Sequence, residues 1–301
     1  MHQYPALKAI YDVPAPAKLN LFLHITGRRE DGYHLIQSVF MLIDWCDTLH
    51  FEVRRDGKIS RTDLPGDSSD CMPAEDLTLR AARALQKACG TAFGVHISLK
   101  KNIPAQAGMG GGSSDAASCL LALQRLWGVR LPRNELLALA LALGADVPFF
   151  LLGSHAWVEG VGEQMSPVDL PAADFLVVKP PAGLSTQAIF SAPGLKRDSE
   201  PAILLSFAAH TQYGAKNPVL KIVGFGRNDL QSVALDLCPQ LGQSLDWLAA
   251  HQLQGRMTGS GSAVFAHLPH GWNVPVVDNN LMPNWIIRKC SNLEVHPLAG
   301  W

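Results

Sequence analysis

Hydrophobic residues recur with two different periods along the chain, and these periods predict a mixture of strands and helices. Residues 95–99 alternate apolar and polar side chains, which is typical of a half-buried strand. Residues 116–127 carry apolar side chains at helical spacing, and the pattern stops at Gly128. Similar patterns predict further strands at residues 17–26, 35–43, 48–53, 149–152, 155–158, 175–181 and 263–268. They predict further helices at residues 76–88, 133–143, 228–235 and 241–253.

Two longer stretches predict loops. Residues 54–73 are rich in Gly, Asp, Ser and Pro, which predicts hairpin loops. Residues 191–218 are polar, contain Pro and Gly, and include one short apolar run at 202–209. We therefore expect a mobile insertion at 191–218.

A glycine-rich loop joins the predicted strand at 95–99 to the predicted helix at 116–127. Glycines permit a tight turn and let backbone N–H groups approach an anion. A serine at 113 or 114 is expected to cap the helix, whose N-terminal N–H groups and dipole favour phosphate. The alternative is that this stretch is only a linker or a tight turn. The motif is neither a Walker A sequence nor the dinucleotide-binding pattern Gly-x-Gly-x-x-Gly. The context favours an ATP site formed by Gly108, Met109, Gly110, Gly111, Gly112, Ser113 and Ser114.

Composition narrows the class of protein. A chain of 301 residues is long enough for two domains, and with 48% hydrophobic and 17% charged residues it can bury sizeable cores. The net charge of −1 and the absence of a basic run argue against a nucleic-acid partner. Residues 1–14 lack the apolar core of a signal peptide, and the apolar stretch at 136–143 is too short to cross a bilayer. We expect a cytoplasmic protein without a membrane partner, either a monomer or a weak homodimer.

The six cysteines are scattered and form no Cys-x-x-Cys pair. This spacing is typical of reduced thiols and not of a disulfide framework or a zinc site. The histidines at 24, 34, 96 and 155 likewise show no metal-ligand spacing. The sequence therefore indicates neither a zinc site nor a histidine cluster for a metal, and it leaves the ligands of any other metal open.

Three polar side chains in apolar surroundings are candidates for chemistry. Lys18 and Asn20 lie two residues apart in a predicted strand, so they share one face; an edge lysine is the alternative for Lys18. Asp146 follows a helix stop at Gly144 and precedes Pro148, which we expect to impose an extended chain. It is either a general base or electrostatic anchor, held by a neighbouring cation, or a turn-capping residue.

A second glycine loop occupies residues 255–262, directly before the predicted strand at 263–268. A tight hairpin would explain it. Two glycine loops in one chain, however, more often line one shared cleft, so we expect this loop to lie beside residues 108–115.

Three motifs resemble those of the superfamily of galactokinase, homoserine kinase, mevalonate kinase and phosphomevalonate kinase. They are Pro-Ala-Lys-Leu-Asn at 16–20, Gly-x-Gly-Gly-Gly-Ser-Ser-Asp at 108–115 and Thr-Gly-Ser-Gly-Ser at 258–262. One branch of this superfamily acts on a substrate that carries a cytidine diphosphate. The chain resembles this branch at residues 26–34, 144–150, 159–163 and 227–230.

The resemblance implies an α+β kinase fold of two domains. Residues 1–160 would form an N-terminal α/β domain like domain 2 of ribosomal protein S5, and residues 161–301 a C-terminal ferredoxin-like α+β domain, with the active site in the cleft between them. The implied reaction is phosphorylation by ATP of the 2-hydroxyl of a diphosphocytidyl-linked methylerythritol, in the non-mevalonate route to isoprenoid precursors. The tail from residue 269 to 301 is the least matched part.

The resemblance also implies roles for the phosphoryl-transfer residues. Asp146 would take the proton of the hydroxyl, while Lys18 would orient the hydroxyl and offset developing charge, as phosphoryl transfer requires. Asp76 stands where an asparagine contacting adenine is expected, although an ionised Asp cannot donate a hydrogen bond. Magnesium is expected with ATP, with Ser113 and Ser114 as candidate ligands.

The same resemblance implies how the substrate is held. Tyr33 and Phe190 would sandwich the cytosine ring, an arrangement that contributes about 1–3 kcal/mol per base in comparable sites. His34 would read the hydrogen-bonding edge of the base, with Thr186 nearby, and Asn20 would hold the methylerythritol end.

Two other functions remain open at this stage. A sister kinase acting on homoserine or mevalonate would share the glycine loops but gives no reason for the Asp-Gly-Tyr-His block at 31–34. A nucleotide-binding sensor without activity on the same fold is the other, because function resides in the site and not in the fold. The joint presence of Lys18 and Asp146 argues against the sensor.

Overall fold

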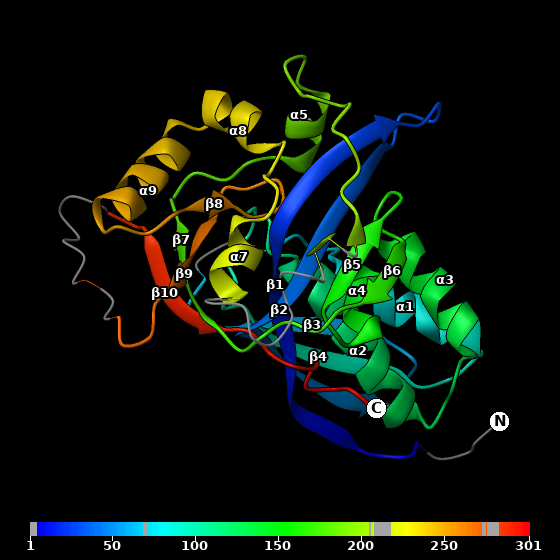
Figure 1. Cartoon of the computed structure of the whole chain (residues 1–301). Coiled ribbons are helices and arrows are strands. Elements are labelled where there is room, and N and C mark those ends of the chain that lie inside the picture. Colours follow the sequence, from blue (N-terminus) through cyan, green and yellow to red (C-terminus); the bar gives the residue numbers. More distant parts are fainter. Residues whose placement is uncertain (1–4, 69–71, 205, 208–217, 273–274, 276–282) are drawn as a thin grey trace.

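The computed structural model describes residues 5–68, 72–204, 206–207, 218–272, 275 and 283–301. Helices and strands are mixed along the chain, and the strands form two sheets (Figure 1). The α+β class predicted from the sequence is therefore confirmed. No helix in the described ranges is long and apolar enough to span a membrane.

The first sheet is built around a long hairpin. Strands β1 and β2 pair antiparallel and are 20 and 21 residues long, because apolar residues continue through both. The sheet has the order β3-β4-β2-β5-β6, with β1 paired to β2. Its strands are β1 (Ala9–Arg28), β2 (His34–Arg54), β3 (Ile59–Leu64), β4 (Gly94–Lys100), β5 (Ala156–Glu159) and β6 (Gln164–Pro167).

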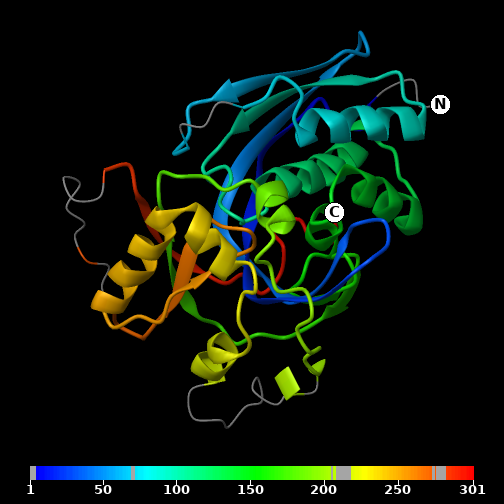
Figure 2. The ribbon, with the colours of Figure 1, turned by 90° about the horizontal axis from the view of Figure 1, so that it is seen from above.

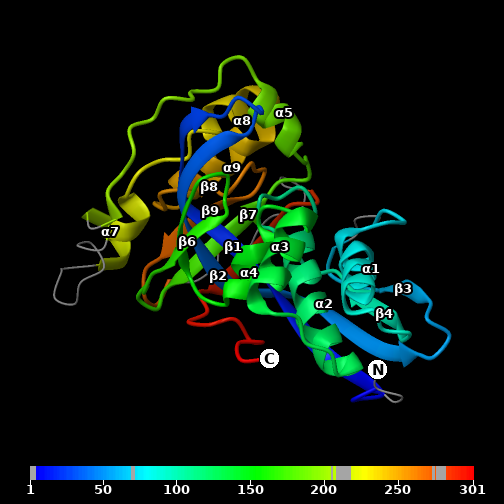
Figure 3. The same cartoon turned by 90° about the vertical axis from the view of Figure 1, so that its right-hand side faces the viewer.

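Four helices cover one face of this sheet, and α1 and α2 lie side by side over it (Figure 3). Helix α2 is the central one, and its residues from Ser114 to Leu120 are all buried. A core of apolar residues from the sheet and the helices, including Phe51, Leu85, Leu123 and Trp127, fills the space between them. The helices are α1 (Leu77–Cys89), α2 (Gly111–Trp127), α3 (Arg133–Leu143) and α4 (Val147–Leu152).

The second sheet lies on the other side of the long hairpin (Figure 2). Its order is β10-β7-β9-β8, and all neighbouring strands are antiparallel. One core joins it to β1 and β2, through Leu19, Trp45, Phe175 and Phe265 among others, and a second core joins it to α8 and α9. The elements are β7 (Asp174–Lys179), α5 (Thr186–Ser191), α7 (Pro218–Gly224), α8 (Gln231–Leu237), α9 (Pro239–Ala250), β8 (Arg256–Met257), β9 (Val264–Leu268) and β10 (Ile286–Ser291).

Several sequence predictions require correction. Residues 149–152 were expected to form a strand, but they lie in helix α4, because Pro148 occupies its first turn, where proline is well tolerated. The predicted loop at 54–73 contains strand β3, which pairs parallel with β4. The predicted strands at 35–43 and 48–53 are one strand, β2. The tail contains strand β10, paired with β7.

The domain boundary predicted near residue 160 stays a prediction. By hydrogen bonding, the first sheet extends to Pro167 and the second begins at Asp174. Residues 205 and 208–217 of the expected insertion at 191–218 lie outside the described residues, as does Cys71. The five cysteines that the structure describes are free thiols.

Candidate active site

The first glycine loop enters helix α2 through residues in the left-handed conformation. Gly108 and Gly110 have φ angles of 72° and 71°, a region that strains any residue with a Cβ. Gly110 is the N-cap, and no side chain caps the helix. The predicted cap by Ser113 or Ser114 is therefore wrong: the helix starts earlier, so both serines lie within its first turn. Because no side chain caps this 17-residue helix, its first N–H groups remain available to a phosphate.

The second glycine loop packs directly against the first. A Cβ on Gly108 would lie 2.2 Å from the carbonyl oxygen of Thr258, and one on Gly259 would lie 2.5 Å from the carbonyl oxygen of Gly108. The N–H of Ser262 donates to the carbonyl of Gln106 at 3.0 Å. The predicted proximity of the two glycine loops is confirmed, and their backbones are close because no side chain separates them.

Lys18 lies beneath the first loop, in the middle of β1. Lys18 is 3% exposed, its ammonium donates to the Asn20 carboxamide oxygen, and this ammonium lies 4.7 Å from the centre of the Phe40 ring. Its backbone N–H donates to the carbonyl of Met109 at 3.0 Å. Burial lowers the pKa of Lys18, and the carboxylate of Asp146 opposes this by favouring the charged form. Lys18 is thus a buried cation, and not an edge lysine.

Asp146 provides the facing carboxylate. It precedes the first residue of α4, its side chain is 32% exposed, and its Oδ2 lies 3.8 Å from the Lys18 Nζ. A Cβ on Gly110 would lie 3.3 Å from the Lys18 side chain and 3.1 Å from the Phe150 ring. The cation, the carboxylate and the glycine loop therefore meet at one point, which is open to solvent on the side of Asp146.

Asn20 is buried and contacts three residues of the protein. Its Nδ2 donates to the Ser38 hydroxyl at 3.0 Å, its Oδ1 accepts from Lys18, and its backbone N–H donates to the Thr258 hydroxyl at 2.9 Å. Asn20 therefore ties Lys18 to the second glycine loop.

Two of the residues expected to bind cytosine, His34 and Phe190, meet at the turn of the β1–β2 hairpin. Helix α5 carries Phe190, whose ring centre lies 5.1 Å from that of His34. Tyr33 is 64% exposed, and no ring contact joins it to Phe190 within the part of the chain described here. Thr186, on the same helix, lies 2.8 Å from the Ser260 hydroxyl of the second glycine loop.

Arg197 completes this group and was missed in the sequence. Its Nε donates to the His34 Nε2 at 3.0 Å, and its Nη2 donates to the carbonyl of Phe190 at 3.2 Å. Burial lowers the pKa of His34, and the charges of Arg197 and Arg28 lower it further. The sequence carried no signal for Arg197, because it lies in a stretch without periodicity.

Asp76 is paired within the protein. It caps helix α1 by accepting from the Leu79 N–H at 3.0 Å, and its Oδ1 lies 2.9 Å from the Arg61 Nη1. Both side chains are at most 7% exposed. Arg61 was missed because it lies on β3, in a stretch predicted to be loop.

A buried ionic triad lies under the first turn of α2. The Lys101 ammonium donates to Asp115 at 2.7 Å and to Asp47, whose other oxygen accepts the N–H groups of Asn102 and Ile103. A Cβ on Gly111 would lie 3.4 Å from the Lys101 Nζ. The sequence signal for this triad was Asp115, because it is a charged residue in a part of helix α2 that is otherwise buried. The triad therefore anchors the glycine loop from below.

The described residues contain no group of three or more His, Cys, Asp or Glu side chains that could hold a metal ion. A cavity of about 470 Å³ lies elsewhere, between α8 and β8, and contains none of the predicted site residues.

Comparisons with known proteins agree with this geometry. Residues 76–154 match the model of the GHMP kinases N terminal domain. The chain is 70% identical to a 4-diphosphocytidyl-2-C-methyl-D-erythritol kinase of Polaromonas sp. (strain JS666), over 98% of this chain and 95% of that relative. It is 59% identical to the protein of the same name from Variovorax paradoxus, over 98% and 99% of the two chains.

Solved structures resemble it as well. The crystal structure of a 4-(cytidine 5'-diphospho)-2C-methyl-D-erythritol kinase matches with a TM-score of 0.69 and 36% identity, covering 84% of this chain and 88% of that chain. An L. major mevalonate kinase, at 14% identity, matches with a TM-score of 0.65 over 97% and 99% of the chains, which shows the shared fold alone.

Proposed function

The chain belongs to the family of 4-diphosphocytidyl-2-C-methyl-D-erythritol kinases, within the GHMP kinases, and we propose that it transfers the terminal phosphoryl group of ATP to the 2-hydroxyl of that substrate. The product belongs to the non-mevalonate route to isoprenoid precursors. The observation that carries the proposal is the meeting of Lys18, Asp146 and Gly110 at one point.

The proposed step is an in-line displacement at the terminal phosphorus. The substrate oxygen forms a bond to phosphorus, the bond to the bridging oxygen of ADP breaks, and the hydroxyl proton goes to Asp146. Lys18 stabilises the charge on the entering oxygen, and its proximity to Gly110 places that charge next to the phosphate loop. Such reactions depend on positioning and on charge neutralisation, which a preformed ion pair supplies.

The proposed ATP site is the first turn of α2 with residues 108–114, supported by the loop at 259–262. Asp76 would face the adenine, with its charge balanced by Arg61. Magnesium, which neutralises phosphate charge when bound, would take most of its ligands from phosphate and water, as it does in many kinases. The hydroxyl of Ser114 fits the remaining part, because its Oγ is buried without a hydrogen-bond partner among the described residues, and Ser113 stays a candidate ligand.

The proposed substrate site runs from Asp146 to α5. Phe190 and the exposed Tyr33 would enclose the cytosine ring, His34 would read its edge, and Thr186 would lie beside it. The proposed role of Asn20 in holding the methylerythritol end stays a prediction. We place this site between the two units of the fold, and we propose a cytoplasmic monomer or weak homodimer.

The test is ADP release by the purified protein with ATP and magnesium, in parallel with the diphosphocytidyl substrate, homoserine and mevalonate. We expect turnover with the cytidyl compound alone. Turnover with homoserine or mevalonate in its place would overturn the substrate, and measurable ATP binding without turnover of any alcohol would overturn the kinase.

A further inference from the structure

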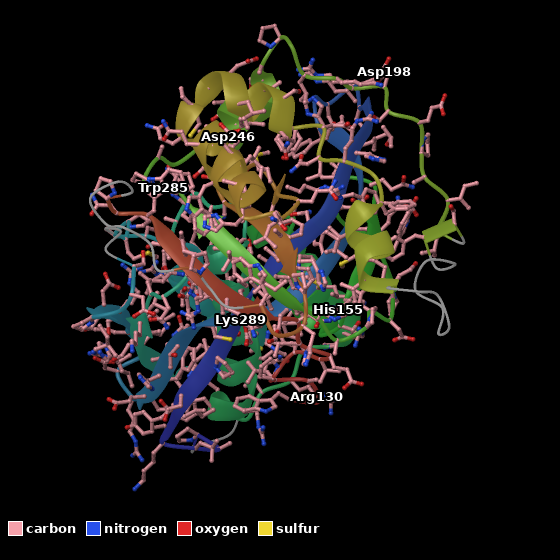
Figure 4. The ribbon with its side chains drawn as sticks, turned by 60° about the vertical axis from the view of Figure 1, so that its left-hand side comes forward. Arg130, His155, Asp198, Asp246, Trp285 and Lys289 are labelled. Carbon is pink, nitrogen blue, oxygen red and sulfur yellow. The ribbon has the colours of Figure 1, made fainter. Side chains whose placement is uncertain are left out.

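Arg197 binds His34 and Phe190, two of the residues expected to hold the base. It lies in the segment after α5, beside Asp198, which Figure 4 shows at the outer end of the molecule. Besides His34 and Phe190, its guanidinium donates to the carbonyls of Ala192, at 2.9 Å, and Leu195, at 3.0 Å. Within the described ranges it forms no ion pair with a carboxylate. The Arg197 guanidinium therefore donates hydrogen bonds only to neutral acceptors in the part of the chain that the structure describes.

The bond from Arg197 determines which nitrogen of His34 carries the proton. An arginine remains protonated in proteins and can only donate. The Nε2 of His34 must therefore accept, so the single proton of the neutral ring lies on Nδ1. Burial and the charges of Arg197 and Arg28 lower the pKa of His34, which keeps the ring neutral. Nδ1 has no hydrogen-bond partner among the described residues, so it offers one free N–H donor.

We infer that Arg197 is a positioning residue that selects cytosine over uracil by holding His34 in the Nδ1–H tautomer; this inference rests on the proposed function. N3 of cytosine is an acceptor and matches an N–H donor. N3 of uracil carries a hydrogen, so two donors would face each other and both would be left unpaired. Sites that hydrogen-bond a substrate reject such analogues strongly.

Arg197 also fixes the aromatic wall of the site. Its Nη2 joins the carbonyls of Phe190 and Ala192, at the C-terminal end of α5. One side chain thus sets both the tautomer of His34 and the position of the ring that packs on it. Removing it frees His34 to adopt the Nε2–H tautomer, whose Nδ1 can accept from uracil N3.

The experiment has one readout that needs no substrate. In ¹⁵N NMR spectra of the free protein at neutral pH, His34 is expected to show the Nδ1–H tautomer. In Arg197→Met the two tautomers should mix. Arg28→Met is the matched control, because Arg28 lowers the same pKa but donates to the Gly32 carbonyl and not to His34. This control should retain the Nδ1–H tautomer. An Nε2–H tautomer in the unmodified protein overturns the inference.

The second readout is the ratio of kcat/KM for the diphosphocytidyl substrate to that for its diphosphouridyl analogue. We expect Arg197→Met to lower this ratio about tenfold or more, the discrimination that one hydrogen bond gives, with an unchanged KM for ATP. Arg197→Lys, which keeps a donor, should recover part of the ratio. A ratio equal to that of the unmodified protein in a folded Arg197→Met variant overturns the inference. If the proposed function is wrong, the unmodified protein shows no turnover. The NMR readout of the His34 tautomer then tests the role of Arg197 by itself.

Discussion

Replacing Lys101 by methionine removes the cation that lies between the buried carboxylates of Asp47 and Asp115. Both carboxylates are fully buried, and Lys101 is 9% exposed. Burial by itself lowers the pKa of Lys101, but the two carboxylates outweigh it and raise the pKa above its ordinary value. Methionine matches the length of the lysine stem, so the main loss is the charge.

The expected cost follows from the burial of the partners. Breaking a buried ion pair by removing one partner typically costs about 3–5 kcal/mol, because a charge is left uncompensated. With a urea m-value of about 3 kcal/mol/M, the unfolding midpoint should fall by roughly 1–1.7 M. Since Lys101 touches Gly111 from below, we also expect a higher KM for ATP.

The assay is urea unfolding followed by circular dichroism, with Lys100→Met as the matched control. Lys100 is half-buried at the end of β4 and forms no ion pair with any residue described here, so its replacement should shift the midpoint little. The double variant Lys101→Met, Asp47→Asn should recover part of the loss, because it removes one of the two carboxylates left without their cation. Equal midpoints for Lys101→Met and Lys100→Met would refute this reasoning.

Asp115 should make the stability of the protein depend on pH. Burial raises the pKa of Asp115 from its ordinary 3.8 to about 8, against the opposing charge of Lys101. A raised pKa means that the folded state binds the proton more tightly, so this stabilisation is present below pH 4 and is lost as the pH rises to about 8. Asp115→Asn resembles the protonated acid, so the protein should lose stability relative to this variant between pH 4 and 8. A constant difference across that range would contradict the assignment.

Three further predictions concern the proposed site. Asp146→Ala should abolish turnover while ATP binding, measured by calorimetry, stays nearly unchanged; near-normal turnover would remove Asp146 from the mechanism. Tyr33→Ala should chiefly raise the KM for the cytidyl substrate, roughly tenfold for a stacking contact of about 1–3 kcal/mol, and an unchanged KM would exclude stacking. Burial lowers the pKa of Lys18 from its ordinary 10.5, so kcat should fall on the alkaline side below pH 10.5 as the ammonium loses its proton, and constant kcat up to that pH would exclude its charge from the reaction.

Local patterns in the sequence predicted most elements of the fold. Helix α1 begins after Asp76 and helix α3 ends before Gly144, as the apolar spacing and the stop signals indicated. The error at α4 has a local cause, because Pro148 is compatible with both an extended chain and the first turn of a helix. Strand β3 was not predicted, because it is short and half-exposed. Its pairing with β4 joins residues far apart in the sequence, which local patterns do not indicate.

The site was predictable only in part. The proximity of the two glycine loops could be expected, because glycines permit close approach of backbones. The pairing of Lys18 with Asp146 joins residues far apart in the chain, and no spacing rule reaches across that separation. Arg61 and Arg197 act through partners brought by other elements, so neither could be assigned before the structure placed Asp76 and His34 beside them.

The position of the transferred phosphate tests the central claim most directly. In 2-C-methyl-D-erythritol the C2 carbon carries no hydrogen, whereas the other hydroxyl-bearing carbons do. After reaction of the diphosphocytidyl substrate with ATP, the ³¹P NMR spectrum should therefore show a new phosphomonoester without splitting by a proton on its carbon, together with an intact substrate diphosphate. A phosphomonoester split by such a proton, or none at all, would contradict the proposed reaction.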